Sequence, residues 1–142
     1  MSGMDPIKNV IQSLWKLFEH TGYQPMKADL QWEVFLNEAD KIRKEAEAKG
    51  SNVDRFCRDA LLSVQNYYVS KNKPLTKETA QKIEIPDRRA IYNALQDARR
   101  IAERKPVDME KYSRCSPPVQ VLSSDLADAA MRAGEAMELE TA

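Results

Sequence analysis

Hydrophobic side chains recur every three or four residues through the first part of the chain, which is the spacing of one helix face. The first stretch opens with Pro6, which suits the first helical position because no amide hydrogen is needed there. It closes at Gly22, a residue type that readily adopts the left-handed backbone that ends helices. The pattern predicts an amphipathic helix between these residues, with its apolar face formed by Ile7, Val10, Ile11, Leu14, Trp15 and Phe18.

Two further helices are predicted before residue 74. Residues 27–49 keep a four-three-four spacing of apolar positions, which gives a seam for packing against other helices: Phe35, Ala39, Ile42 and Ala46. The next helix begins near Asn52 and ends before Pro74, because proline disfavours helical geometry in the residue that precedes it. It carries the strongest amphipathic stripe in the chain: Val53, Phe56, Cys57, Ala60, Leu61, Val64, Tyr67 and Tyr68.

Residues 74–105 predict a short helix, a tight turn and a longer helix. Thr76 is expected to cap the short helix, since a threonine hydroxyl can accept a hydrogen bond from a free amide of the first turn. The longer helix begins at Pro86 and Asp87. Its positions that face the core are Ile91, Ala94, Leu95, Ala98, Ile101 and Ala102.

The order of residues in ETAQKIEIPDRRAIYNAL resembles bacterial helix-turn-helix segments. A polar start is followed by the small Ala80, then by Ile83 before the turn and Ile85 after it. The resemblance implies that the two helices cross closely at Ala80, and we expect Leu75 to pack against Ala80 at the cap. It also implies DNA binding, with the second helix in the major groove. The alternative is a structural helix pair of the kind found in many bundles.

The outer face of the longer helix holds the candidate nucleic-acid-binding residues. Four polar side chains recur opposite the apolar stripe: Arg89, Asn93, Gln96 and Arg100. Arginine can form paired hydrogen bonds with guanine, as asparagine and glutamine can with adenine. Nearby cations are expected to contact phosphates: Lys73, Lys77, Lys82, Arg88 and Arg99. The alternative is an ordinary solvated helix face.

The C-terminal third shows a weaker pattern. Residues 106–122 have no clear period and contain Pro117–Pro118, so we expect an irregular linker after a helical core domain of residues 1–105. A last helix with an acidic tail is predicted in residues 123–142, capped by Ser123 or Ser124. Its apolar stripe is small, which leaves loose docking, pairing with another chain and fraying all open.

Composition and charge refine this picture. The chain has only four glycines and contains no runs of β-branched residues, so little interrupts the helical patterns. We therefore predict an all-α, single-domain bundle of five to six helices with an embedded helix-turn-helix-like pair. The net charge is zero, but it is unevenly distributed: −3 (3 basic, 6 acidic) in residues 1–40, +7 (18 basic, 11 acidic) in residues 41–115 and −4 (1 basic, 5 acidic) in residues 116–142. A basic middle section is compatible with nucleic-acid binding.

The chain offers little for catalysis. His20 is the only histidine, no glycine-rich phosphate loop is present, and Cys57 and Cys115 form no metal or redox motif. We therefore expect no enzymatic activity, no cofactor and no metal. Cys57 lies on an apolar stripe, whereas Cys115 lies in the expected linker and is the candidate for a reactive thiol. No stretch is long and apolar enough to span a membrane, and the first residues lack a signal-peptide pattern, so we expect a reduced, cytoplasmic protein.

Two functional hypotheses follow. The first is a small DNA-binding regulatory protein, dimeric to match paired half-sites. The second is a helical adaptor that docks on a protein partner, either within a nucleoprotein assembly or as a phage-type inhibitor of a host machine. The acidic ends of the chain suit the second hypothesis because they can meet a basic partner.

Overall fold

The computed structural model describes residues 5–23 and 25–141, so the outermost residues of the expected first and last regions, 1–4 and 142, lie outside the described residues. The described part contains six α-helices, one 3₁₀ helix and no strand, which confirms the all-α prediction. The elements are α1 (Asp5–Thr21), α2 (Asp29–Ala48), α3 (Ser51–Lys71), α4 (Lys77–Gln81), α5 (Asp87–Ala102), η1 (Glu110–Arg114) and α6 (Pro117–Thr141).

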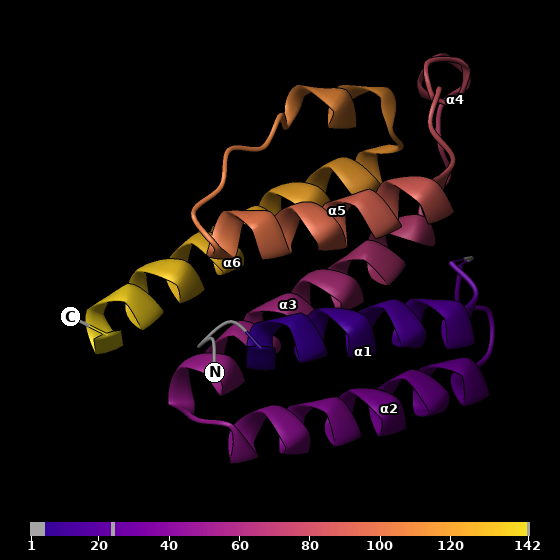
Figure 1. The fold of residues 1–142 in the computed structure, drawn as a ribbon. Coiled ribbons are helices and arrows are strands. Elements are labelled where there is room, and N and C mark those ends of the chain that lie inside the picture. Colours follow the sequence, from indigo (N-terminus) through magenta and orange to yellow (C-terminus); the bar gives the residue numbers. More distant parts are fainter. Residues whose placement is uncertain (1–4, 24, 142) are drawn as a thin grey trace.

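The helices pack around α3 and α5. Helix α1 contacts α2, α3 and α5, whereas α6 makes its extensive contacts with α3 and α5. Helix α2 lies at one edge of the molecule, and α4 projects from one end of the bundle (Figure 1). The two links that follow α1 and α2 contain glycines with positive φ, Gly22 at +80° and Gly50 at +128°, where a side chain would be strained.

Aromatic side chains fasten α1 to α3. Phe18 of α1 lies edge-on to Tyr67 of α3, with ring centroids 5.6 Å apart, and both rings are buried. The Tyr67 hydroxyl donates a hydrogen bond to the carbonyl oxygen of Tyr23 at 2.8 Å, and the Tyr68 hydroxyl hydrogen-bonds with Thr21. Because buried hydroxyls need partners, these bonds fix where the end of α1 meets α3.

The C-terminal helix differs from its prediction. It begins at Pro117, within the expected linker, because proline fits the first turn of a helix as well as it fits a loop. Val119 and Leu122 are therefore buried helical residues, and Ser123 is no cap: its hydroxyl donates to the carbonyl oxygen of Gln120 at 2.9 Å. Loose docking was also wrong for this helix, since its whole predicted stripe is buried: Leu126, Ala129, Ala130, Ala133 and Met137.

Small residues let α6 approach α5 closely. A methyl group built on Gly134 of α6 would lie 2.7 Å from the carbonyl oxygen of Ala102 in α5. Ala98 and Ala102 on α5 and Ala133 on α6 are all buried. Alanine-rich stripes bury little area per residue, but they bring the backbones together and increase the number of van der Waals contacts.

We expect Gly134→Ala to destabilise the protein by about 1–3 kcal/mol, because the added methyl overlaps backbone that cannot move aside independently. Alanine favours the helix over glycine by about 1 kcal/mol, and this gain offsets part of the cost of the overlap. Urea unfolding followed by circular dichroism measures the difference. Ser124→Ala, at an exposed site of the same helix, is the matched control and should change stability little. A Gly134→Ala protein as stable as wild type would contradict the close crossing.

Candidate nucleic-acid interface on helix α5

The predicted faces of α5 are correct. Its buried side holds Ala90, Ile91, Ala94, Leu95, Ala98 and Ala102, with Ile101 half-buried. On the other side Arg89 and Arg100 are exposed, whereas Asn93 and Gln96 are half-buried. The structure therefore gathers the four residues predicted to read bases on one accessible helix face.

The arginines of this face differ in their partners. Arg88 lies 3.7 Å from the carboxylate of Glu19, Arg99 lies 3.2 Å from Glu103, and the Arg100 guanidinium is 3.2 Å from Asp97. Within the described residues, Arg89 has no ion pair. The Arg88–Glu19 pair is exposed and contributes little stability, so Arg88 can exchange its carboxylate for a phosphate at small cost. The Arg99–Glu103 pair is half-buried.

Tyr92 lies among these cations, and the sequence reasoning missed it. Its side chain is 46% exposed, and its ring meets the half-buried Trp15 of α1 edge-on, with centroids 5.1 Å apart. The signal was present in the sequence, since Tyr92 is four residues after Arg88 and four before Gln96. An aromatic ring between cations offers a stacking surface for a base.

The short helix α4 does not pack as expected. Thr76 does cap it, accepting a hydrogen bond from the Thr79 amide at 3.2 Å. None of its residues is buried, however, and both Ala80 and Leu75 are exposed, so the expected close crossing at Ala80 is wrong. The segment is held elsewhere: the amide of Glu84 donates to the carbonyl oxygen of Arg114 at 2.8 Å.

The three predicted phosphate-binding lysines of this region lie on or beside α4. Lys73, Lys77 and Lys82 are all exposed, and the segment that carries them projects beyond α5 (Figure 1). The structure therefore places these cations at one end of the molecule, next to the start of α5. It separates them from Arg99 and Arg100, which lie near the other end of the helix.

Two aspartates of α5 hold the segment between α5 and α6. Asp97 is buried, and its carboxylate accepts hydrogen bonds from the Tyr112 hydroxyl at 2.5 Å and from the Lys111 ammonium at 2.6 Å. Asp87, at the start of α5, accepts from the Ser116 hydroxyl at 3.0 Å and pairs with Lys71 of α3. Both η1, through Lys111 and Tyr112, and the residue that precedes α6, Ser116, are thus attached to α5.

Burial and the neighbouring carboxylate of Asp97 raise the pKa of Tyr112 well above its usual range. The Tyr112 hydroxyl therefore stays protonated and acts as a donor to Asp97. The arrangement also places a negative charge beneath Arg100, which weakens the outward field of that arginine.

Both thiols are buried, including Cys115, which was the candidate for a reactive thiol. Its amide bonds to the carbonyl oxygen of Tyr112 at 3.1 Å, and its own carbonyl oxygen accepts from the Gln120 side chain at 3.0 Å. Burial raises the pKa of Cys115, and the negative charge of the nearby Asp87 raises it further. Burial raises the pKa of Cys57 to about 12. Neither group is a thiolate at neutral pH, so neither suits nucleophilic chemistry.

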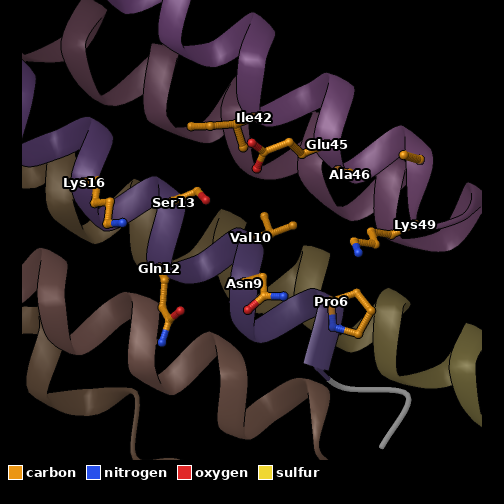
Figure 2. Close-up of a pocket in the computed structure, with 11 residues that line it drawn as sticks. Pro6, Asn9, Val10, Gln12, Ser13, Lys16, Ile42, Glu45, Ala46 and Lys49 are labelled. Atoms are coloured by element: carbon orange, nitrogen blue, oxygen red, sulfur yellow. The ribbon is translucent and has the colours of Figure 1, made fainter. Parts of the chain in front are cut away.

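A groove of about 500 Å³ separates the first half of α1 from the second half of α2. Figure 2 shows Ser13 and Lys16 on its α1 side and Glu45 and Lys49 on its α2 side. The lining contains one carboxylate and no histidine or cysteine. Elsewhere in residues 5–23 and 25–141, no cluster of three or more metal-ligating side chains occurs.

Comparisons of the chain with models of known protein families, with curated proteins and with solved structures find no match. No helix in the described part is both long and apolar enough to cross a membrane.

We expect Cys115→Ser and Cys57→Ser to destabilise the protein alike, each by about 1–3 kcal/mol, because a buried hydroxyl without a good partner loses its hydration. Thermal unfolding of the two variants checks this. Ser113→Ala, at an exposed site two residues before Cys115, is the control for the segment. A Cys115→Ser protein with the same melting temperature as wild type would show that this thiol does not contribute to packing.

We expect Tyr112→Phe to lower the free energy of unfolding by about 1.5–3 kcal/mol, the usual contribution of a hydrogen bond to a charged group. The change leaves Asp97 buried with one donor fewer. Tyr92→Phe is the control, because the Tyr92 side chain is exposed and makes no hydrogen bond within the described residues. Equal stability of the two variants in urea unfolding would show that the Asp97 contact contributes nothing.

Proposed function

We propose that the protein is a non-enzymatic, DNA-binding regulatory protein that contacts its ligand through the outer face of α5. One observation carries this proposal: a single accessible helix face combines Arg88, Arg89, Arg99 and Arg100 with Asn93, Gln96 and an exposed Tyr92. Cations supply the affinity for phosphates, and the amide side chains supply groups that can read base edges.

Phosphate contacts are assigned to the cations around the face. Lys73, Lys77 and Lys82 are exposed beside the N-terminal end of α5, and Arg88 and Arg99 flank Tyr92 along the helix. Neutralising phosphates releases counterions, so affinity for any sequence should fall with added salt.

Base contacts are assigned first to Arg89 and Asn93. Arg89 has no ion-pair partner within the described residues, so its guanidinium can bind a base edge without first leaving a carboxylate. Asn93 is one turn further along the same face. Arg100 is less suited to this role, because it already hydrogen-bonds with Asp97. Tyr92 adds an aromatic surface beside them.

The mode of docking follows from the position of α4. Since α4 has no buried residue, it does not support α5 in the way that the first helix of a helix-turn-helix supports the second. Helix α5 is instead supported from behind by α6 and at its side by α1. In the proposed complex α5 approaches DNA as part of the bundle, and the α4 segment reaches the backbone beside it.

We expect Arg89→Ala and Asn93→Ala each to lose about 1–3 kcal/mol of preference for the correct site, because base-edge hydrogen bonds carry discrimination. Lys77→Ala should instead weaken binding to all sequences and reduce the salt slope by about one. The measurement is fluorescence anisotropy with labelled genomic DNA fragments at low and moderate salt.

Arg43→Ala is the matched control, because it removes the same charge from an exposed site on α2, the helix at the far edge from α5. It should leave DNA binding unchanged. If wild-type protein has no affinity for DNA even at low salt, or if Arg43→Ala weakens binding as much as Arg89→Ala, the proposed interface is wrong.

A further inference from the structure

A second surface lies along the seam between α3 and the first half of α6. Several of the large hydrophobic side chains that remain exposed lie on or beside this seam: Leu62 at 56%, Val69 at 47%, Leu75 at 42% and Val121 at 51%. An exposed group of apolar side chains rimmed by polar ones is typical of a protein-binding surface.

One end of the seam is apolar. A depression of about 280 Å³ is formed there mainly by apolar side chains, Leu75, Val121 and the prolines Pro74, Pro117 and Pro118, and its lining is completed by Ser70, Lys73, Thr76 and Thr79. Proline side chains are rigid, so this end is pre-shaped to receive an apolar group and little conformational entropy is lost on binding.

The other end is acidic. A depression of about 290 Å³ is lined by Leu62 together with Asp59, Asp125 and Asp128. The one cation in its lining, Arg132, lies 4.0 Å from Asp59 and leaves the other two carboxylates without an ion pair within the described residues. Partial burial and the neighbouring Asp128 raise the pKa of Asp125. A cation bound between these carboxylates would relieve their repulsion.

The two depressions follow one another along α3. The acidic depression contains Leu62, and the apolar depression contains Ser70, eight residues further along α3, which corresponds to about 12 Å of helix. On a bound helix, side chains about two turns apart are separated by a similar distance, so one helix can reach both depressions.

We propose that this α3–α6 furrow docks an amphipathic helix of a protein partner, with its apolar side chains at Leu75 and Val121 and its lysines or arginines at Asp125 and Asp128. The proposal rests on charge and shape complementarity along the furrow. Its apolar end adjoins the α4 segment, since Lys73 also lines that depression. Partner helices with this pattern are recognised by their apolar anchors, and their charges set orientation and specificity.

The test uses a fluorescein-labelled synthetic helical peptide of leucine and lysine, long enough to span both depressions, and measures its affinity for the full chain by anisotropy. Asp125→Asn with Asp128→Asn should weaken binding by about tenfold. Val121→Ser should weaken it by about fivefold, because it removes apolar area from the contact. Both changes are at surface positions and should leave the melting temperature near that of wild type.

Matched controls exist for both variants. Glu135→Gln with Glu138→Gln removes the same charge from another part of α6, and Leu30→Ser removes an exposed apolar side chain from α2. Neither should change the affinity. The proposal is overturned if the peptide does not bind, if the controls weaken it equally, or if a peptide of scrambled order binds as well. Sedimentation that shows a dimer of the chain dissociated by Val121→Ser would assign the furrow to a second copy and likewise overturn the proposal.

Discussion

Gly134 of α6 faces the carbonyl oxygen of Ala102 at a distance that leaves no room for a methyl group. This approach requires small side chains along both helices, and the buried alanines of α5 and α6 supply them. Because α6 also packs on α3, one helix fixes the relative positions of two others. The consequence for function is direct: α5 is supported from its alanine side, so its arginine side faces outward.

A second constraint acts on the segment that joins α5 to α6. A carboxylate removed from water is stable only when several donors surround it. Asp87 is surrounded by the donors Ser116 and Lys71. Asp97 is surrounded by Tyr112 and Lys111. The second half of the segment is thereby attached to α5 at two places. Asp97 also lies 3.2 Å from the Arg100 guanidinium and lowers the outward field of that arginine.

Local patterns predicted most of the fold, and the errors have a common cause. Helices α1, α2, α3 and α5 follow their apolar stripes because amphipathic periodicity is a property of the segment itself. The close packing of α6 could not be predicted from its sequence. An alanine stripe is weakly apolar, and it stabilises the fold only when the facing helix also carries small side chains. The segment that carries Ala80 is attached by a hydrogen bond from the Glu84 amide to the carbonyl oxygen of Arg114, far along the chain, and no local pattern marks such a contact. The candidate face itself was predictable, and Tyr92 was predictable with it, because it lies four residues after Arg88 and four before Gln96.

The zero net charge of the chain does not describe either proposed interface. Charges in water act over about 8–10 Å at physiological ionic strength, so a ligand responds to the surface that it approaches and little to the whole molecule. The fold separates the charges accordingly, with arginines and lysines on α5 and near α4, and with Asp59, Asp125 and Asp128 along the α3–α6 furrow. A nucleic acid and a basic protein helix would each meet a surface of opposite sign. The charge gradient along the sequence predicts these surfaces only in part. Asp125 and Asp128 come from the acidic C-terminal section, whereas Asp59 comes from the basic middle section and reaches the furrow because α3 packs on α6.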